Sequence, residues 1–314
     1  MSEVIATRVA YGRELEALGA ENPLITVLDA DLSICTMTMY FAEKFPERFF
    51  NVGIAEANMV GIGAGMAACG LIPFVNSFAM FSAGRAYEQI RNSVAYPRLN
   101  VKVVGTHAGL SVGEDGATHQ CIEDISLMRT IPGMTVVVPC DATETRLATR
   151  ALAELEGPAY LRLGRSAVAP AVDDVADYRF ELGKASLLRE GCDATIIACG
   201  LMVQPSLAAA NHLAGSGISV RVLDMHTIKP IDRESILMAA RETGVILTAE
   251  EHNIIGGLGG AVAEVLAESD IACRFRRVGV NDQFGHSGSA DDLLEMYGLT
   301  DARLIDELKG LLSL

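Results

Sequence analysis

The sequence predicts an α/β protein made of two three-layer α/β/α domains, each with a mostly parallel sheet between helices. Short runs of Val, Ile and Leu alternate with longer helical segments along nearly the whole chain, which is typical of parallel βα units. Half of the 314 residues are hydrophobic, only 5% are aromatic and tryptophan is absent, as in proteins with aliphatic buried strands. The alternation stops near residue 169 and starts again near residue 183, so we expect two domains.

The first domain, residues 1–168, is predicted to alternate helix and strand. Helices are predicted where apolar residues recur every three or four positions, and strands where a short apolar run is bounded by turn residues. The expected helices span 3–19, 37–44, 57–69, 82–95, 122–130 and 141–155. The expected strands span 24–29, 48–52, 71–75, 101–106, 135–138 and 159–163.

Residues 169–182 are predicted to form a linker because they contain Pro170 and an acidic run and lose the periodicity. The pattern then restarts in a smaller second domain, residues 183–314. Its expected strands span 195–200, 217–224, 244–251 and 275–280. Its expected helices span 202–214, 232–241 and 257–268, followed by two terminal helices.

Charge and cysteine content exclude several classes of protein. A net charge of −15, from 40 acidic and 25 basic residues, disfavours nucleic acid and anionic membrane as partners. Residues 1–19 carry charges at helical spacing and no apolar core, so we expect neither a signal peptide nor an anchor. The seven cysteines are scattered and never spaced CxxC. We therefore expect a cytoplasmic protein with reduced thiols and no metal site of its own.

Residues 49–85 contain one carboxylate, Glu56, followed by 28 residues without a charged side chain until Arg85. Crossing a bilayer takes about 20 apolar residues, but four glycines, Pro73 and Asn76 break this run. We predict instead a buried helix and strand, with Glu56 at a strand-to-helix corner. The helix dipole would favour the ionised carboxylate by roughly 0.3–1 kcal/mol. Burial would favour the neutral acid more strongly, so we expect a buried Glu56 to share a proton with a ligand.

Two glycine-rich segments have alternative explanations. The segment GIGAG at 61–65 lies inside a predicted helix, and Arg85 stands where a dinucleotide fingerprint needs an acid, so close helix packing explains it better. The segment GGLGG at 256–260 follows a strand and opens a helix. Its N–H groups could cradle an anion, and tight strand-to-helix packing explains it equally well.

The loop THAGLSVGEDGATHQC, residues 106–121, follows the C-terminal end of a predicted strand. Open α/β sheets bind their ligands at such ends. Two histidines and two acids, His107, Glu114, Asp115 and His119, lie within this glycine-rich loop. The combination predicts a polar functional site without naming its ligand.

These stretches resemble the pyrimidine-binding domain of transketolases, which are thiamine diphosphate enzymes. The segments NVGIAEANMVGIGAGMAACGLIPFVNSFAMF and HAGLSVGEDGATHQ carry the resemblance. It continues through IPGMTVVVPCDATE, LRLGR and the second-half EEHNIIGGLGGAV, so it covers nearly the whole chain. The resemblance implies a pyrimidine-binding domain followed by a transketolase C-terminal domain.

The resemblance implies that four residues bind the cofactor. Glu56 matches the catalytic glutamate that hydrogen-bonds N1′ of the aminopyrimidine and thereby activates the thiazolium carbon. Phe78 and Phe81 match aromatic residues that pack on the pyrimidine ring. Arg85 is expected to bind the cofactor beside them.

Five further positions match substrate-contacting residues of the family. His107 and His119 match positions that contact the sugar and take part in catalysis, and Asp115 is expected to meet a sugar hydroxyl. Arg8 and Arg165 match arginines that hold the sugar phosphate, a task suited to planar bidentate donors.

The chain lacks one part of a full-length transketolase. That part is an N-terminal domain whose Gly-Asp-Gly segment holds the diphosphate and Mg²⁺ (or Ca²⁺), and no such segment occurs here. The resemblance therefore implies the C-terminal subunit of a split transketolase, which would move a two-carbon ketol unit from a ketose phosphate to an aldose. We expect an N-terminal partner subunit, self-association through both domains and an α2β2 heterotetramer.

Three alternatives stay open. The β subunit of a 2-oxo acid dehydrogenase has a similar layout, although GEDGATHQ favours transketolase. A 1-deoxyxylulose-5-phosphate synthase-like or sulfosugar-directed enzyme is the second alternative, and GRAYEQ at 84–89 resembles the synthase. A non-catalytic assembly subunit is the third alternative. Cys35, Gly84 and Ala117 depart from common transketolase residues, which leaves the acceptor sugar undetermined.

Overall fold

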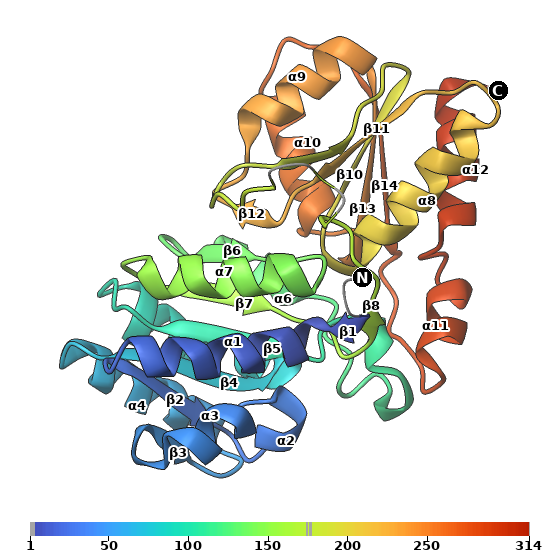
Figure 1. Cartoon of the computed structure of the whole chain (residues 1–314). Helices are drawn as coiled ribbons and strands as arrows, with labels where there is room; N and C mark the ends of the chain where they lie inside the picture. The colour runs from blue at the N-terminus through green and yellow to red at the C-terminus, as the bar shows by residue number, and fades with distance from the viewer. Residues whose placement is uncertain (1–3, 174, 176–177, 314) are drawn as a thin grey trace.

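The computed structural model describes residues 4–173, 175 and 178–313. The described residues form two large sheets, each with helices on both faces, and a two-stranded sheet. In Figure 1 most first-half elements lie below most second-half elements. Most neighbouring strands run parallel, as predicted for this fold class. In the described part of the chain, no helix has both the length and the hydrophobicity to cross a bilayer.

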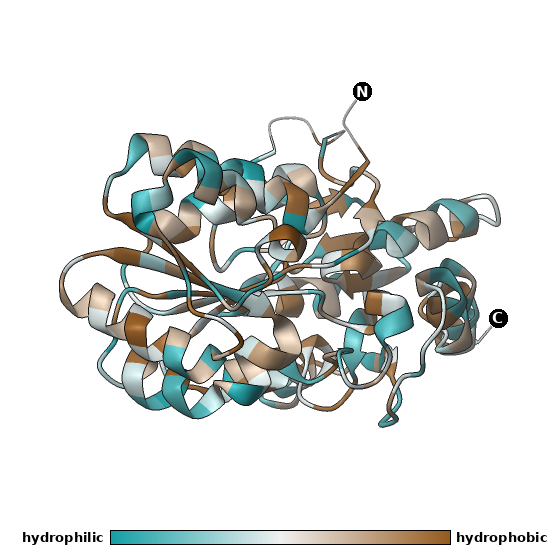
Figure 2. Ribbon diagram, turned by 90° about the horizontal axis from the view of Figure 1, so that it is seen from below, coloured by the Kyte–Doolittle hydropathy of each residue, from teal (hydrophilic) through white to brown (hydrophobic). Residues whose placement is uncertain are grey.

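The first sheet has seven strands in the order β12-β6-β7-β5-β4-β2-β3, and only β12 runs antiparallel to its neighbour. Its strands are β2 (Ile25–Asp29), β3 (Phe49–Asn51), β4 (Ile72–Phe78), β5 (Lys102–Thr106), β6 (Thr135–Val137), β7 (Ala159–Arg162) and β12 (Thr227–Lys229). Every residue of β2 and β5 is buried, because helices cover both faces of the sheet. Figure 2 shows the hydrophobic residues gathered along the strands and the inner sides of the helices.

Helices pack on this sheet close to the predicted positions. They are α1 (Thr7–Glu21), α2 (Ser33–Thr36), α3 (Met39–Lys44), α4 (Glu56–Ala68), α5 (Tyr87–Gln89), α6 (Asp124–Thr130) and α7 (Ala142–Glu154). Helix α7 begins where the Asp141 side chain accepts a hydrogen bond from the N–H of Glu144, an N-cap that satisfies a free backbone donor. Shorter turns are η1 (Pro46–Arg48), η2 (Met80–Arg85), η3 (Ile90–Ala95) and η4 (Leu110–Asp115).

Three first-half predictions need correction. The predicted helix 3–19 starts only at Thr7, because Ile5–Ala6 forms β1 and pairs with β8 (Ala167–Val168); residues 1–3 lie outside the described residues. The predicted helix 37–44 begins later because Met37, with φ of +66°, separates α2 from α3. The predicted helix 82–95 is instead two π-helical turns, η2 and η3, on either side of α5.

The strand predicted at 71–75 runs on to Phe78. The sequence indicated a break at Asn76, but its side-chain amide donates to the carbonyl oxygens of Leu28 and Phe74 and accepts from the Tyr11 hydroxyl. A buried polar side chain with all these partners is compatible with a central strand. Phe78 therefore lies at the carboxyl end of β4.

The second sheet has five strands in the order β14-β13-β10-β11-β9, and only β9 is antiparallel to its neighbour. Its strands are β9 (Ser186–Arg189), β10 (Ala194–Ala198), β11 (Val220–Asp224), β13 (Val245–Asn253) and β14 (Arg274–Val280). The turn η5 (Gly200–Met202) precedes α8 (Val203–Ala214), and the other helices are α9 (Arg233–Thr243), α10 (Leu258–Ala267), α11 (Ala290–Met296) and α12 (Asp301–Leu312). The sequence did not predict β9.

Strand β12 joins the two halves. It belongs to the second half of the sequence but pairs antiparallel with β6 at the edge of the first sheet (Figure 1). A hydrophobic cluster reinforces this connection, since Met128 and Ile131 share it with Leu258 and Val262. The sequence did not predict β12, because three residues carry too little periodicity to indicate a strand.

The two glycine-rich segments have separate explanations. A Cβ at Gly63 would lie 2.7 Å from Cγ1 of Val75, so close packing on β4 explains this glycine; Gly61 and Gly65 instead face open space. In GGLGG, the N–H groups of Leu258 and Gly259 donate to the Glu250 carboxylate. The anion cradled by this segment is therefore the protein's own glutamate.

Candidate active site

Four aromatic side chains gather where β4 and β5 end. Phe78 ends β4, Phe81 lies in η2, and His107 and His119 belong to the loop after β5. The rings of Phe78 and His107 are stacked with centroids 3.9 Å apart, and Phe81 lies 6.2 Å from Phe78. His119 meets the edge of Phe81 at 5.2 Å. We call these four residues the aromatic cluster; it offers flat apolar surfaces beside polar ring nitrogens.

Glu56 is the first residue of α4 and is only 1% exposed. Nη1 of Arg85 donates to its Oε2 at 2.8 Å, and the same guanidinium lies 4.8 Å from the centre of the Phe81 ring. Arg85 thus links the carboxylate to the aromatic cluster. The sequence did not predict this ion pair, which offsets the cost of burying the carboxylate. Glu56 is buried as expected but is not a lone acid.

His107 directly follows β5 and has a φ of +55°. Its Nδ1 lies 3.0 Å from Oγ1 of Thr106, and the side chain is buried. Burial, followed by the positive charges of Arg8 and Arg165, lowers the pKa of His107 from 6.5 to about 3. His107 is therefore neutral at physiological pH, so it offers a hydrogen bond rather than a positive charge.

Arg8 and Arg165 lie together beside His107. Nε of Arg8 is 3.5 Å from the carbonyl oxygen of Arg165, and its Nη1 donates to the carbonyl oxygen of Cys35 at 2.7 Å. Nη1 of Arg165 donates to Oε2 of Glu114 at 2.7 Å. Two neighbouring guanidinium groups suit an anionic ligand, which would share Arg165 with Glu114.

Asp115 is the predicted site residue that the structure does not bring into this group. It is exposed at the end of η4. Within the described ranges, it forms no hydrogen bond or ion pair with another predicted site residue. Its contact with a sugar hydroxyl stays a prediction.

Sequence analysis missed residues that support the site. Asp29, at the end of β2, accepts hydrogen bonds from the N–H of Leu32 and the hydroxyls of Thr36 and Thr38, so it shapes the segment that offers Cys35 to Arg8. Glu251, in the second half, accepts from the N–H of Ser111 in the predicted substrate loop. Both are charged residues at the end of an apolar strand, and that signal could have identified them.

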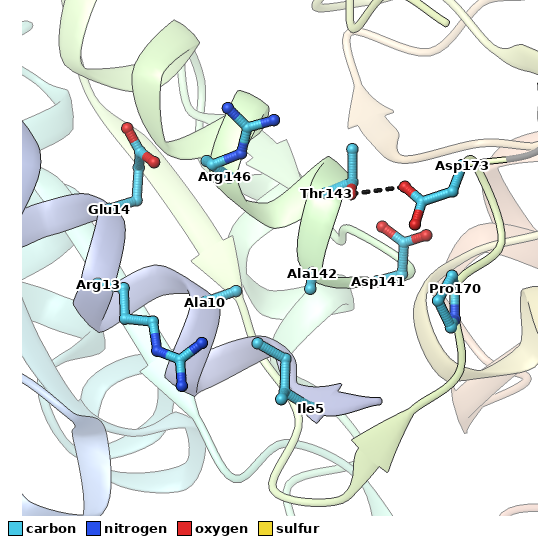
Figure 3. Close-up of a pocket in the computed structure, with 10 residues that line it drawn as sticks. All are labelled: Ile5, Ala10, Arg13, Glu14, Asp141, Ala142, Thr143, Arg146, Pro170 and Asp173. Atoms are coloured by element: carbon cyan, nitrogen blue, oxygen red, sulfur yellow. Dashed lines mark hydrogen bonds between the residues drawn. The ribbon is translucent and has the colours of Figure 1, made fainter. Parts of the chain in front are cut away.

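A cavity of about 630 Å³ lies elsewhere, between the N-terminal parts of α1 and α7 (Figure 3). None of the predicted site residues lines it. Its acids have protein partners, since Glu14 forms an ion pair with Arg150 and Asp173 accepts from the Thr143 hydroxyl. The cavity is therefore separate from the aromatic cluster.

One group of side chains with metal-binding potential occurs among the described residues. The ligand atoms of Cys140, Glu144 and Asp224 lie within 4.8 Å of one another. All three are buried, and none belongs to the predicted site.

Two family descriptions match the chain. Residues 3–170 match "Transketolase, pyrimidine binding domain" and residues 183–304 match "Transketolase, C-terminal domain". The chain belongs to the transketolase family. The predicted resemblance is thereby confirmed, and the family is one of thiamine diphosphate enzymes.

Three related proteins show the kind of transketolase section that the chain resembles. A solved structure titled "Split gene transketolase, inactive beta4 tetramer" is 53% identical, with a TM-score of 0.91 and 99% of each chain covered. The "6-deoxy-6-sulfo-D-fructose transketolase subunit SqwH" of Clostridium sp. (strain MSTE9) is 48% identical over 90% of this chain and 86% of that protein. An apulose-4-phosphate transketolase subunit of Phocaeicola vulgatus is 40% identical, with 95% of each covered. The chain is thus similar to C-terminal sections of split transketolases.

The residues present fit one half of thiamine diphosphate. The buried Glu56 carboxylate and the rings of Phe78 and Phe81 suit an aminopyrimidine. Among the described side chains, the only group close enough to hold a metal ion lies outside this site, and the sequence contains no Gly-Asp-Gly segment. The fit therefore covers the pyrimidine half of the cofactor.

Proposed function

We propose that the chain is the C-terminal subunit of a two-component transketolase, which transfers a two-carbon ketol unit from a ketose phosphate to an aldose acceptor. One observation carries the proposal. A buried carboxylate, Glu56, is linked through Arg85 to a pair of phenylalanine rings at the carboxyl ends of parallel strands. This is the chemistry that an aminopyrimidine needs from its protein, because it combines a proton-sharing acid with a flat apolar surface.

The proposal assigns the pyrimidine half of the cofactor to this chain. Thiamine diphosphate, when bound, supplies the nucleophilic carbon and the electron sink for cleaving the bond beside a ketose carbonyl. Glu56 would hold a proton at the pyrimidine N1′, while Phe78 and Phe81 would hold the ring. Arg85 is half exposed. When the cofactor binds, Arg85 would release the Glu56 carboxyl so that it can contact the pyrimidine ring.

The substrate residues would act by hydrogen bonding and charge. The neutral His107 and the neighbouring His119 would contact the oxygens of the sugar, with Asp115 at a hydroxyl. Arg8 and Arg165 would hold the anionic end. Two relatives are named for a sulfosugar and for a sugar phosphate, and both kinds of sugar end in an anion. A guanidinium pair suits either one.

A partner subunit completes the proposed enzyme. It would carry the Gly-Asp-Gly segment that holds the diphosphate and Mg²⁺ (or Ca²⁺), in an α2β2 assembly. Two relatives are named as subunits, and a similar structure of β chains alone is described as inactive, which supports the need for a partner.

Titration calorimetry tests the division of the cofactor site. The isolated chain is expected to bind thiamine diphosphate and Mg²⁺ weakly or not at all, because it lacks the diphosphate half. The complex with the partner should bind both. Tight, Mg²⁺-dependent binding by the isolated chain would contradict the two-component proposal.

Replacing the catalytic carboxyl tests the chemistry. In the reconstituted complex, Glu56→Gln should lower ketol transfer at least about 100-fold, because the amide cannot share a proton. The matched control is Glu154→Gln, which makes the same change at an exposed position of α7 and should leave turnover unchanged. Unchanged turnover in Glu56→Gln with the assembly intact would favour the non-catalytic alternative. Activity with pyruvate instead of a ketose phosphate as donor would favour the 1-deoxyxylulose-5-phosphate synthase-like or 2-oxo acid dehydrogenase alternatives.

A further inference from the structure

Two adjacent glutamates near the end of β13 point in opposite directions, as successive residues of a strand do. The Glu250 carboxylate accepts hydrogen bonds from the N–H groups of Leu258 at 2.7 Å and Gly259 at 2.8 Å, at the start of α10. The Glu251 carboxylate instead leaves the second domain and accepts from the N–H of Ser111 at 2.6 Å. One glutamate therefore holds its own domain, and the other holds the loop that carries His107 and His119.

The loop backbone lies directly on the Glu251 carboxylate. Gly109 has a φ of +83°, and a Cβ at this position would lie 2.3 Å from Cδ of Glu251. The N–H of Gly109 donates to the carbonyl oxygen of Cys121 at 2.8 Å, which closes the base of the loop. Only glycine fits between this closed base and the carboxylate.

Arg162 holds Glu251 in place. Its Nη2 donates to the backbone carbonyl oxygen of Glu251 at 2.8 Å and lies 3.4 Å from that of Cys121. Its Nε donates to Oδ2 of Asp124 at 2.8 Å. One guanidinium thus ties β13 to the base of the loop and to the helix that follows it.

A second contact from the same domain supports the loop. Nε2 of Gln120 donates to the carbonyl oxygen of His286 at 2.9 Å. The loop therefore meets the second domain both near Ser111 and near Gln120. His107 precedes the first of these contacts, and His119 precedes the second.

We propose that Glu251 is a positioning residue for ketol transfer. It acts through Ser111 and Gly109 to set the backbone of residues 107–121, and this places His107 and His119 against the phenylalanine rings. The second domain thereby contributes to the reaction without touching the substrate. The inference rests on the proposed function, since it assigns a role within the same site.

The neighbouring glutamates provide a matched pair of variants. In the reconstituted complex, Glu251→Ala should lower kcat/KM at least about tenfold and raise the KM for the sugar, because small displacements of reacting groups are costly. Glu250→Ala also removes a buried acceptor of backbone N–H groups, but it should change kcat/KM less than about threefold. Glu251→Gln keeps an oxygen for Ser111 and should restore most of the activity. Equal kinetic effects of the two alanine variants would overturn the inference.

Hydrogen exchange provides a readout that needs no activity. In the isolated chain, Glu251→Ala should speed amide exchange in residues 107–121, whereas Glu250→Ala should speed it in residues 257–268. Unchanged exchange in residues 107–121 of Glu251→Ala would overturn the inference.

If the wild-type complex transfers no ketol unit, the proposed function fails, and the exchange result alone decides whether Glu251 holds the loop. If Glu251→Ala does not assemble, Gly109→Ala should lower kcat/KM in its place by pressing on the same carboxylate, and wild-type kinetics there would also overturn the inference.

Discussion

Two clusters of buried acids join the first half of the chain to the second, and they manage their charge in opposite ways. In the first cluster, Arg162 stands between Asp124 of the first half and Glu251 of the second. Burial lowers the pKa of Arg162, but Asp124 and Glu251 together raise it above its ordinary value. This cluster therefore contains a permanent positive charge beside its acids.

The second cluster has no such cation. Glu144 of α7 and Asp224 at the end of β11 lie close together beside Cys140. Among the described residues, no lysine or arginine forms an ion pair with either acid. Tyr178 and the N–H of Cys140 donate to Glu144. Burial, followed by the charge of Glu144, raises the pKa of Asp224 well above its ordinary value. Burial thus favours the neutral form of Asp224.

The comparison indicates that a buried acid between the two halves is stabilised either by a neighbouring guanidinium or by protonation. The cluster around Arg162 supports the loop of the candidate active site, where donors and acceptors have fixed positions. The cluster around Asp224 lies apart from that site. Because one cluster depends on a permanent charge and the other on a titratable proton, substitutions and pH should separate them.

The largest expected effect comes from removing the guanidinium. Arg162→Met leaves Asp124 and Glu251 buried without their cation and should lower the free energy of unfolding by about 3–5 kcal/mol. Urea unfolding of the chain measures this loss. Arg233→Met is the control, because Arg233 forms an exposed ion pair with Glu268 and should cost less than about 1 kcal/mol. Similar losses in both variants would contradict the role assigned to Arg162.

Low pH should reduce the stability that His252 contributes beside the Arg162 cluster. His252, beside this cluster, accepts from the N–H of Ser126 and donates to the carbonyl oxygen of Asn253, and burial lowers its pKa from 6.5 to about 4. The unfolded chain takes up the proton below pH 6.5 and the folded chain only near pH 4, so the contribution of His252 to stability falls as the pH drops between these values. The loss should approach roughly 3 kcal/mol. Urea unfolding at several pH values should show a shallower decline in His252→Gln, and identical declines would contradict this account.

The smallest expected effect concerns the other cluster, and its dependence on pH has the opposite sign. The folded chain keeps a proton on Asp224 that the unfolded chain releases above its ordinary pKa of 3.8, so this residue makes stability fall as the pH rises. Asp224→Asn removes this titration, because an amide stays neutral at every pH. The difference in unfolding free energy between Asp224→Asn and the wild type should therefore shift in favour of the variant as the pH rises.

The control for this variant is Asp306→Asn, which makes the same change on the exposed side of α12. The difference in unfolding free energy between Asp306→Asn and the wild type should not change with pH. A pH-independent difference for Asp224→Asn as well would contradict a raised pKa of Asp224.

Much of the fold could be predicted because buried parallel strands leave a local signal. The runs LITVLD and VKVVGT indicated strands, and β2 and β5 lie there with every residue buried. The π-helical turns had no such signal. π-helical turns are rare, so helical periodicity predicted an ordinary helix over residues 82–95. Only the structure shows that η2 brings Phe81 and Arg85 together.

Part of the candidate site could also be predicted from the sequence. His107 and His119 stood out as polar residues in a glycine-rich loop after a strand, and the structure places both in the aromatic cluster. The contact between Glu251 and Ser111 joins residues 140 positions apart, so no local pattern could indicate it. The same is true of the pairing of β12 with β6.

The sequence by itself determined which segments could be buried and where a single acid would stand at the start of an uncharged helix. These properties depend on neighbouring residues, whose spacing sets one face of a helix or strand. Only the tertiary structure decided which charges meet, as Arg85 meets Glu56 and Arg162 meets Asp124. A buried charge is stabilised by whatever partner the fold brings within hydrogen-bonding distance, and that partner need not be near it in the chain.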